Sequence, residues 1–196
     1  MKTSRPNEIN SRFFDYLLAS NRPYLAGFKK WLLQPGMLFN SLETWWGEKK
    51  PRPTPHEGLD LCWFEDLTGQ IKQLDTNIKI PAAFAGKIVK IGHDFLGKSI
   101  YLSHEIFAAD GRQLYTAYGH TEPLAAIHVG QVVAAGEIIA ALAAGPGKSP
   151  KIPSHLHLTL AWIPASLPTD QLNWRNLGAD RTIRLIDPQS ILPVPA

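Results

Sequence analysis

Residues 154–162 read SHLHLTLAW, and the alternation of polar and apolar side chains in this stretch predicts a β-strand. Successive side chains of a strand point to opposite faces, so His155 and His157 lie on one face and the leucines on the other. The leucine face predicts contact with a hydrophobic core. Two imidazoles on the opposite face, two residues apart, can both point at one metal ion or at one reacting group.

A second group of polar residues follows a proline-rich run, where residues 55–61 read PHEGLDL. The prolines and Gly58 argue against a helix that would make His56 and Asp60 neighbours. On a straight strand these two side chains would be about 13 Å apart, whereas the ligands of one tetrahedral zinc ion lie about 3–4 Å apart. We therefore expect the chain to bend at Gly58. His56, Asp60 and one histidine of the later pair would then form a catalytic type of zinc site, with its fourth position open to water.

A third histidine stands at the end of a strand-like run, in residues 115–121, which read YTAYGHT. His120 follows a glycine there and lies where a loop begins. A lone histidine in such a place is most often a surface residue. The chemical interest of His120 therefore depends on its being near the other histidines.

Residues rich in Ile, Val, Leu and Tyr alternate with turn residues through the middle of the chain, which predicts an antiparallel sheet. Asp110-Gly111 predicts a hairpin turn, and a further strand pair is expected around Gly136. Residues 145–150 are rich in glycine and proline and predict a loop just before the two histidines. The predicted strands lie at residues 87–91, 99–104, 113–118 and 132–142.

The first part of the chain has a different character. Apolar side chains recur at helical spacing in residues 9–17 and again in residues 25–32, so the sequence predicts two short helices. The prolines from residue 51 onward then predict an extended connection. We therefore divide the chain into an N-terminal helical extension with its linker, residues 1–50, and a β-rich domain with a C-terminal tail, residues 51–196.

Composition and charge are those of an ordinary globular protein. The chain has 196 residues, of which 44% are hydrophobic and 19% charged, and its net charge of +3 is too small to indicate a nucleic-acid partner. The single cysteine, Cys62, excludes an intramolecular disulfide. No apolar run approaches the roughly 18 residues of a membrane-spanning helix. The polar residues after Met1 do not predict an export signal.

Taken in order, these motifs resemble the lysostaphin-like (LytM-type) zinc metallopeptidases, most of which cut peptide bonds in bacterial peptidoglycan. The family pattern is H-x-x-x-D, then Tyr-x-His after a strand, a glycine-containing hairpin and a final H-x-H, and the resemblance covers about residues 55–162. The matching residues are His56 and Asp60, Tyr118-Gly119-His120, VGQVVAAG at 129–136, and His155-Leu156-His157.

The resemblance implies a mainly β fold, an antiparallel β-sandwich or duplicated hybrid barrel, with a short helical extension at the N-terminus. It implies that His56, Asp60 and His157 bind Zn²⁺, while His120 and His155 act on a peptide substrate. His155 could take a proton from water or hold the water by a hydrogen bond, and His120 could stabilise the oxyanion. It also implies a place in the cell envelope or outside the cell, although no signal peptide is visible.

Two other functions are compatible with parts of the same pattern. A zinc-bound but catalytically silent wall-binding or regulatory module would share the fold, with residues 1–50 across its cleft. A biotinyl or lipoyl carrier would share the hairpin, but the chain has no suitably flanked lysine at a hairpin tip.

Several other residues have simpler interpretations. We expect Glu57 at the rim or on the surface, Cys62 as a core thiol rather than a fourth ligand, and Trp45 and Trp46 as the contact that docks the N-terminal segment. Trp162 is either the floor of a substrate groove or a buried aromatic residue at a strand end. Outside the motifs, His104 is expected to be packed or hydrogen-bonded, and His93 and His128 to lie in turns.

Overall fold

Antiparallel strands make up most of the fold. The computed structural model describes residues 9–47, 50–144 and 152–192, so the loop predicted at 145–150 lies outside the described residues. The helices are α1 (Phe13–Ser20) and α2 (Trp174–Ala179), with short 3-10 turns at Pro35–Met37, Thr169–Gln171 and Pro188–Ile191. The strands are β1 (Phe28–Leu32), β2 (Leu59–Leu61), β3 (Trp63–Asp66), β4 (Ile71–Gln73), β5 (Lys79–Pro81), β6 (Gly86–His93), β7 (Lys98–Phe107), β8 (Gln113–Pro123), β9 (Val132–Val133), β10 (Ile138–Leu142), β11 (Leu156–Ile163) and β12 (Arg184–Ile186).

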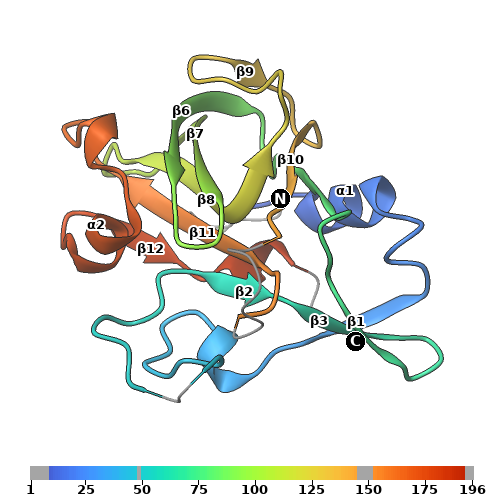
Figure 1. Cartoon of the computed structure of the whole chain (residues 1–196). Coiled ribbons are helices and arrows are strands. Elements are labelled where there is room, and N and C mark those ends of the chain that lie inside the picture. The colour runs from blue at the N-terminus through green and yellow to red at the C-terminus, as the bar shows by residue number, and fades with distance from the viewer. Residues whose placement is uncertain (1–8, 48–49, 145–151, 193–196) are drawn as a thin grey trace, which may run out of the picture.

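Within the described residues, nine strands form one sheet, in which β12, β11, β8, β7, β6 and β9 are successive neighbours. Strand β2 pairs with β11, and β10 pairs with both β5 and β8. Figure 1 shows the green β6–β7 hairpin curling over the orange β11, with β2 on the other side of that strand. β7 and β8 are antiparallel neighbours on either side of Asp110 and Gly111. The predicted antiparallel, mainly β fold is thus confirmed.

The second predicted helix, over residues 25–32, is wrong. Residues 28–32 form strand β1, which pairs with β3 in a separate three-stranded sheet completed by β4. Phe28 stacks on Phe64 of β3 at 5.6 Å between ring centroids, and Trp31 meets the same ring edge-on. Phe28 and Trp31, which suggested a helix, are therefore partly buried against a neighbouring strand, and tertiary packing overrides local periodicity. Gly27, with φ of 69°, makes the turn that leads into this strand.

The prediction that the strands on either side of Gly136 pair with each other is also wrong. Both strands exist, but β9 pairs with β6, whereas β10 pairs with β5 and β8. Gly136 has φ of 81°, and its amide donates to the carbonyl of Ala82. The turn is therefore tied to the chain before β6, which separates the two strands instead of joining them in a hairpin.

Helix α1 packs into the same core as the sheet. Phe13 and Leu17 are buried, as their helical spacing predicted, and both belong to the cluster that also contains Tyr118 of β8 and Leu158 of β11. The domain boundary predicted near residue 50 stays a prediction. Described residues on both sides of it contribute to one hydrophobic core. Among the described residues, none of the helices has the length and apolar character needed to cross a membrane.

Strand β11 is the element that positions the histidines. It lies between β2 and β8, and every one of its eight residues is buried. In this register His157 stands opposite Asp60 on β2 and opposite Gly119 on β8, next to His120. Three segments that are far apart in the sequence therefore meet at one point of the sheet.

Candidate metal centre and active site

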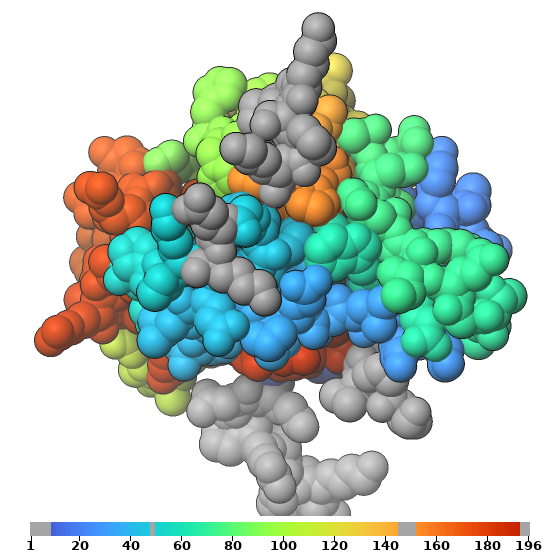
Figure 2. All heavy atoms as spheres, turned by 60° about the horizontal axis from the view of Figure 1, so that its bottom comes forward, coloured from blue at the N-terminus to red at the C-terminus, as the bar shows by residue number. Residues whose placement is uncertain are grey.

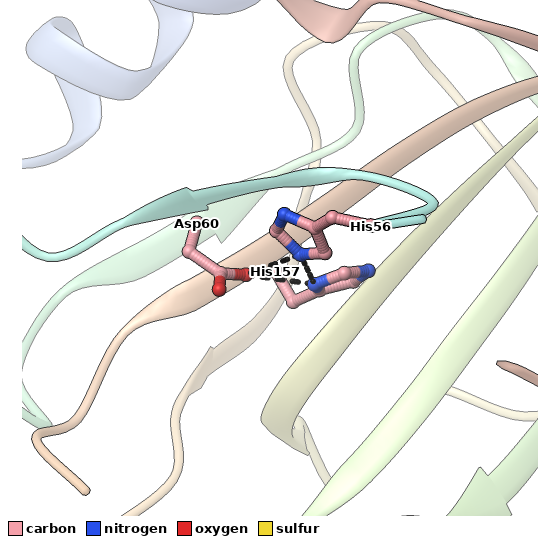
Figure 3. Close-up of side chains that lie close together, drawn as sticks. All are labelled: His56, Asp60 and His157. Carbon is pink, nitrogen blue, oxygen red and sulfur yellow. Dashed lines mark hydrogen bonds and ion pairs between the residues drawn. The ribbon is translucent and has the colours of Figure 1, made fainter. Parts of the chain in front are cut away.

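Three buried side chains converge on one point, and all three were predicted as metal ligands. One nitrogen each from His56 and His157 and one oxygen from Asp60 lie within 4.8 Å of one another. His56 Nε2 is 3.3 Å from Asp60 Oδ1, and His157 Nδ1 is 2.7 Å from the same oxygen. Figure 3 shows His56 and Asp60 reaching this point from the cyan segment around β2 and His157 from β11.

The bend between His56 and Asp60 depends on Gly58, as the sequence predicted. A Cβ atom added at Gly58 would lie 2.5 Å from the Leu158 carbonyl oxygen and 2.7 Å from His157 Nε2. Only a residue without a side chain allows the backbone to approach β11 this closely. Glycine therefore brings the first ligand pair against the strand that carries the third.

Partners outside the group fix the orientation of each candidate ligand. His56 donates its Nδ1–H to the Leu38 carbonyl at 3.0 Å, and the Thr159 hydroxyl lies 3.1 Å from His157 Nε2. Asp60 Oδ2 accepts a hydrogen bond from the Trp45 indole N–H at 2.7 Å. These contacts leave His56 Nε2, His157 Nδ1 and Asp60 Oδ1 facing one another. Two imidazole nitrogens and one carboxylate oxygen are a donor set of catalytic zinc sites, so the residues present fit a zinc ion.

His155 lies beside this group with one nitrogen unused. Its Nδ1–H donates to the Pro153 carbonyl at 2.8 Å, and its Nε2 is buried without a hydrogen-bond partner among the described residues. That Nε2 atom is 3.8 Å from Asp60 Oδ1. Burial lowers the pKa of His155 to about 4, although Asp60 opposes the shift. His155 is therefore a neutral imidazole at pH 7 with a free lone pair directed at the candidate metal site.

His120 faces His155, with 4.6 Å between the ring centroids. Its backbone is left-handed, with φ of 61°. Asp94 accepts hydrogen bonds from both the backbone N–H, at 2.9 Å, and the ring Nδ1–H, at 3.1 Å. Burial alone would raise the pKa of Asp94, but the bonds from His120 and Ser99 outweigh it and hold the pKa well below its usual range. Asp94 is thus an ionised acceptor that orients His120.

Comparison with known proteins identifies the family. The sequence pattern described as "Peptidase family M23" matches residues 66–168, just over half of the chain. The chain belongs to peptidase family M23. This match includes His120, His155 and His157 but begins after His56 and Asp60, which the fold brings to the same point. The family is zinc-dependent, in agreement with the donor set.

Solved structures of similar proteins include lysostaphin from Staphylococcus simulans, with 19% sequence identity and a TM-score of 0.41. A zinc-containing peptidase from Vibrio cholerae has 18% identity and a TM-score of 0.41, and LytU has the same two values. The alignments cover 87%, 68% and 80% of this chain, and 60%, 36% and 90% of those chains respectively. The M23 chain thus spans less than two thirds of the first two proteins. No curated protein matches it, and its family membership rests on residues 66–168.

The charge of the M23 site is concentrated on Asp60. Burial alone would raise the pKa of Asp60, but the neighbouring His56 and His155 and the hydrogen bond with His157 outweigh it and hold the pKa well below its usual range. Arg52 adds a positive charge, with Nη2 3.7 Å from Asp60 Oδ2. An ionised carboxylate beside two imidazoles makes the site attractive to a divalent cation.

The remaining predicted residues lie outside the three-ligand group. Cys62 is a buried core thiol, as expected, and burial raises its pKa to about 12. His104 is buried and hydrogen-bonded as predicted, and Trp162 is a buried aromatic residue of β11. Glu57 is partly buried. Of the two histidines expected in turns, His93 instead ends β6, and His128 lies beside a turn.

Sequence reasoning missed the residues that support the site. Trp45 was predicted only as a docking contact, and it does pack against Met37 and Cys62, but its hydrogen bond to Asp60 was not foreseen. Asp94 received no role, because no local pattern links a turn residue to a histidine 26 positions later. The sequence likewise indicated no role for Trp174 of α2, whose ring centroid lies 4.4 Å from that of His157.

Proposed function

We propose that this M23 peptidase is a zinc-dependent endopeptidase in which His56, Asp60 and His157 hold the ion and His155 and His120 act on the substrate. One observation carries the proposal. Three ligand atoms lie within 4.8 Å of one another, and a buried histidine nitrogen that has no hydrogen-bond partner in the described part of the chain lies 3.8 Å from the ligand oxygen. A structural zinc site, which closes with a fourth protein ligand, would not need such a group.

When bound, zinc supplies Lewis-acid chemistry, since it polarises a carbonyl group and acidifies water. The other steps belong to the protein. His155 Nε2 acts as the general base that removes a proton from the attacking water. The Pro153 carbonyl supports this assignment because it holds the proton of His155 on Nδ1 and leaves the lone pair on Nε2.

His120 acts on the opposite side of the reacting carbonyl. Its Nδ1–H donates to the ionised Asp94 carboxylate, which holds the ring in place. A protonated Nε2 would then donate a hydrogen bond to the oxyanion that develops as water attacks, or a proton to the departing amine. His155 and His120 would thus divide the base and acid roles between them.

Stem or cross-bridge peptides of bacterial peptidoglycan are the proposed substrates. The support is the full set of motif residues of the lysostaphin-like peptidases, from His56 to His157. A substrate of this kind places the enzyme in the cell envelope or outside the cell.

One observation favours a second candidate, a zinc-bound module that grips wall peptides without cutting them. None of the five site residues is more than 5% exposed, and the rings of Trp45 and Trp46 pack against His155. Substrate could reach the proposed base only if some of these side chains move. Turnover separates the two candidates, because only the endopeptidase produces new amino termini.

The test compares wild type, His157→Ala and His155→Ala for bound zinc and for release of amino groups from purified peptidoglycan and from cross-bridge peptides. His157→Ala should lose zinc and turnover together. His155→Ala should keep zinc and lose about 100- to 10,000-fold in turnover, the usual contribution of a general base. His128→Gln changes an exposed histidine and should match wild type. Zinc in wild type without turnover would favour the silent module, and equal turnover in all variants would refute the metal mechanism.

A further inference from the structure

Residues 36–47, which precede the part of the chain matched by the family, lie against the candidate metal site. Figure 2 shows this blue-to-cyan part of the chain spread across one face, between the orange-red C-terminal segment and the green β3–β4 hairpin. Met37 and Trp45 form a small buried cluster with Cys62, which anchors residues 36–47 just behind Asp60. They therefore belong to the surroundings of the site.

Backbone hydrogen bonds hold this segment in place. The amide of His56 donates to the Ser41 carbonyl at 2.9 Å, and the amide of Asn40 donates to the His56 carbonyl at 2.8 Å. Arg52 donates to the carbonyls of Glu43, at 3.0 Å, and of Gly36, at 3.1 Å. A segment tied to a candidate ligand residue at both its amide and its carbonyl is a fixed part of the site.

The segment also contacts two of the three candidate ligands through polar atoms. The Leu38 carbonyl accepts the Nδ1–H of His56, which leaves Nε2 free for the metal. The Trp45 indole N–H donates to Asp60 Oδ2 at 2.7 Å, and the Arg52 guanidinium lies 3.7 Å from the same oxygen. Trp45 is only 7% exposed and Asp60 is fully buried, so water does not compete for this bond.

We propose that Trp45 is a positioning residue for the metal site. Its N–H engages Asp60 Oδ2, so that Oδ1 is the carboxylate oxygen presented to the ion. The proposal rests on the proposed zinc site, and it assigns part of that site to a segment outside the family match. Hydrogen bonds of this kind to a ligand are commonly worth about 10- to 100-fold in metal affinity.

Two roles of Trp45 can be told apart by experiment: positioning Asp60, or acting as a plug, a side chain that only blocks access to His155. A side chain that merely covered His155 would, when removed, raise turnover and leave zinc affinity unchanged. A side chain that orients Asp60 would, when removed, lower zinc affinity. The neighbouring Trp46 offers a control, because its ring also packs on His155 but, within the described residues, no hydrogen bond joins it to Asp60.

The experiment measures the zinc dissociation constant of the full chain by competition with a chelator, and the turnover of the zinc-loaded protein on cross-bridge peptides. We expect Trp45→Phe to weaken zinc binding about 10- to 100-fold, and Trp46→Phe to bind zinc within about twofold of wild type. Replacing Trp45 by benzothienylalanine, which keeps the shape of the indole but has sulfur in place of N–H, should weaken binding as Trp45→Phe does. The thermal midpoint of each zinc-free protein shows whether it is folded, and the visible spectrum of the cobalt-loaded protein reports any change in ligand number.

Each outcome has a definite meaning. Wild-type zinc affinity in folded Trp45→Phe, or in the benzothienylalanine protein, would overturn the positioning role and leave the zinc site intact. Higher turnover with unchanged affinity would show that Trp45 is a plug. If wild type bound no zinc, or if His157→Ala bound it equally well, the proposed zinc site itself would fail.

Discussion

His120 combines an unusual backbone with a charged partner. A left-handed conformation in a residue other than glycine costs about 1–3 kcal/mol and is found where the surroundings impose it. Here Asp94 imposes it, because one carboxylate binds both the amide and the ring of His120. The two hydrogen bonds fix the ring in front of His155, so Asp94 determines where the proposed acid is held.

Asp94→Asn tests this dependence. The substitution removes the charge but nearly preserves the shape, and a hydrogen bond to a charged group is worth about 1.5–3 kcal/mol. We expect kcat to fall about 10- to 100-fold, with zinc content unchanged, in an assay of peptide cleavage. Asp75→Asn changes an aspartate that caps another turn and should have little effect. Unchanged kcat in Asp94→Asn, or loss of zinc, would contradict the assignment.

Gly58→Ala tests the close approach of the first ligand pair to β11. The new Cβ would lie 2.5 Å from the Leu158 carbonyl oxygen and 2.7 Å from His157 Nε2, so the chain at residue 58 and β11 must move apart. Overpacking of this kind costs about 1–3 kcal/mol, and the displaced ligands should also bind zinc more weakly. Thermal melting and zinc titration would measure both effects. Gly92→Ala is the control, because its added Cβ would come no closer than 3.8 Å to Lys90; equal effects of the two variants would refute the argument.

At the scale of the elements, β7 and β8 share a buried titratable group away from the site. His104 of β7 donates its Nδ1–H to the Ala85 carbonyl, and its Nε2 lies 2.7 Å from the Thr116 hydroxyl of β8. Burial lowers the pKa of His104 from 6.5 to about 4, and the bond to Ala85 opposes part of that shift. The folded sheet therefore favours the neutral ring.

This lowered pKa makes stability depend on pH. The unfolded chain binds the proton first as the pH falls, so the stabilisation by His104 is complete above pH 6.5 and is lost toward pH 4. At pH 5 the loss is about 2 kcal/mol. Urea unfolding of the zinc-free protein at pH 7.5 and 5 should show a smaller acid effect in His104→Gln than in wild type. His128→Gln should lose as much free energy of unfolding between pH 7.5 and pH 5 as wild type does. An equally large loss in His104→Gln would contradict the prediction.

The sequence predicted the positions of strands better than it predicted which strands pair with each other. Runs with clear turns between them, such as those of β7 and β8, were correct because the turn residues fix the pairing locally. The sequence predicts a helix over residues 25–32 because Phe28 and Trp31 are three positions apart. In the folded chain, an irregularity in pairing between residues 28 and 30 and contacts with Phe64 place both residues in a strand. The separation of β9 from β10 depends on a bond from Gly136 to Ala82, which no local pattern contains.

At the scale of the whole molecule, α1 and the site-bearing sheet share one core. Leu17 is 1% exposed and lies in the same cluster as Leu158 of β11. Leu17→Ala should therefore cost about 2–5 kcal/mol and lower the midpoint of a single calorimetric transition. Tyr24→Ala, at a side chain that is 43% exposed, should change the midpoint far less. A separate early transition that alone responds to Leu17→Ala would show that residues 1–50 fold independently.

The residues that carry the proposed chemistry could be predicted from the sequence, but their supports could not. His56, Asp60, His120, His155 and His157 were identified because their motifs, each weak alone, occur together in the order that matches a family. Tryptophan and aspartate have many ordinary roles, so Trp45 and Asp94 carry no such signal. Their contribution comes from contacts between segments, which only the folded chain makes.

The pairing of β2 with β11 has a consequence for the order of events during folding. Asp60 and His157 are 97 positions apart, and contacts between distant residues form late because a long loop must close first. A chain that has formed only its local hairpins offers no zinc site. In refolding experiments, tight zinc uptake should lag behind the appearance of β-structure, so the rate of uptake would report the closing of the sheet.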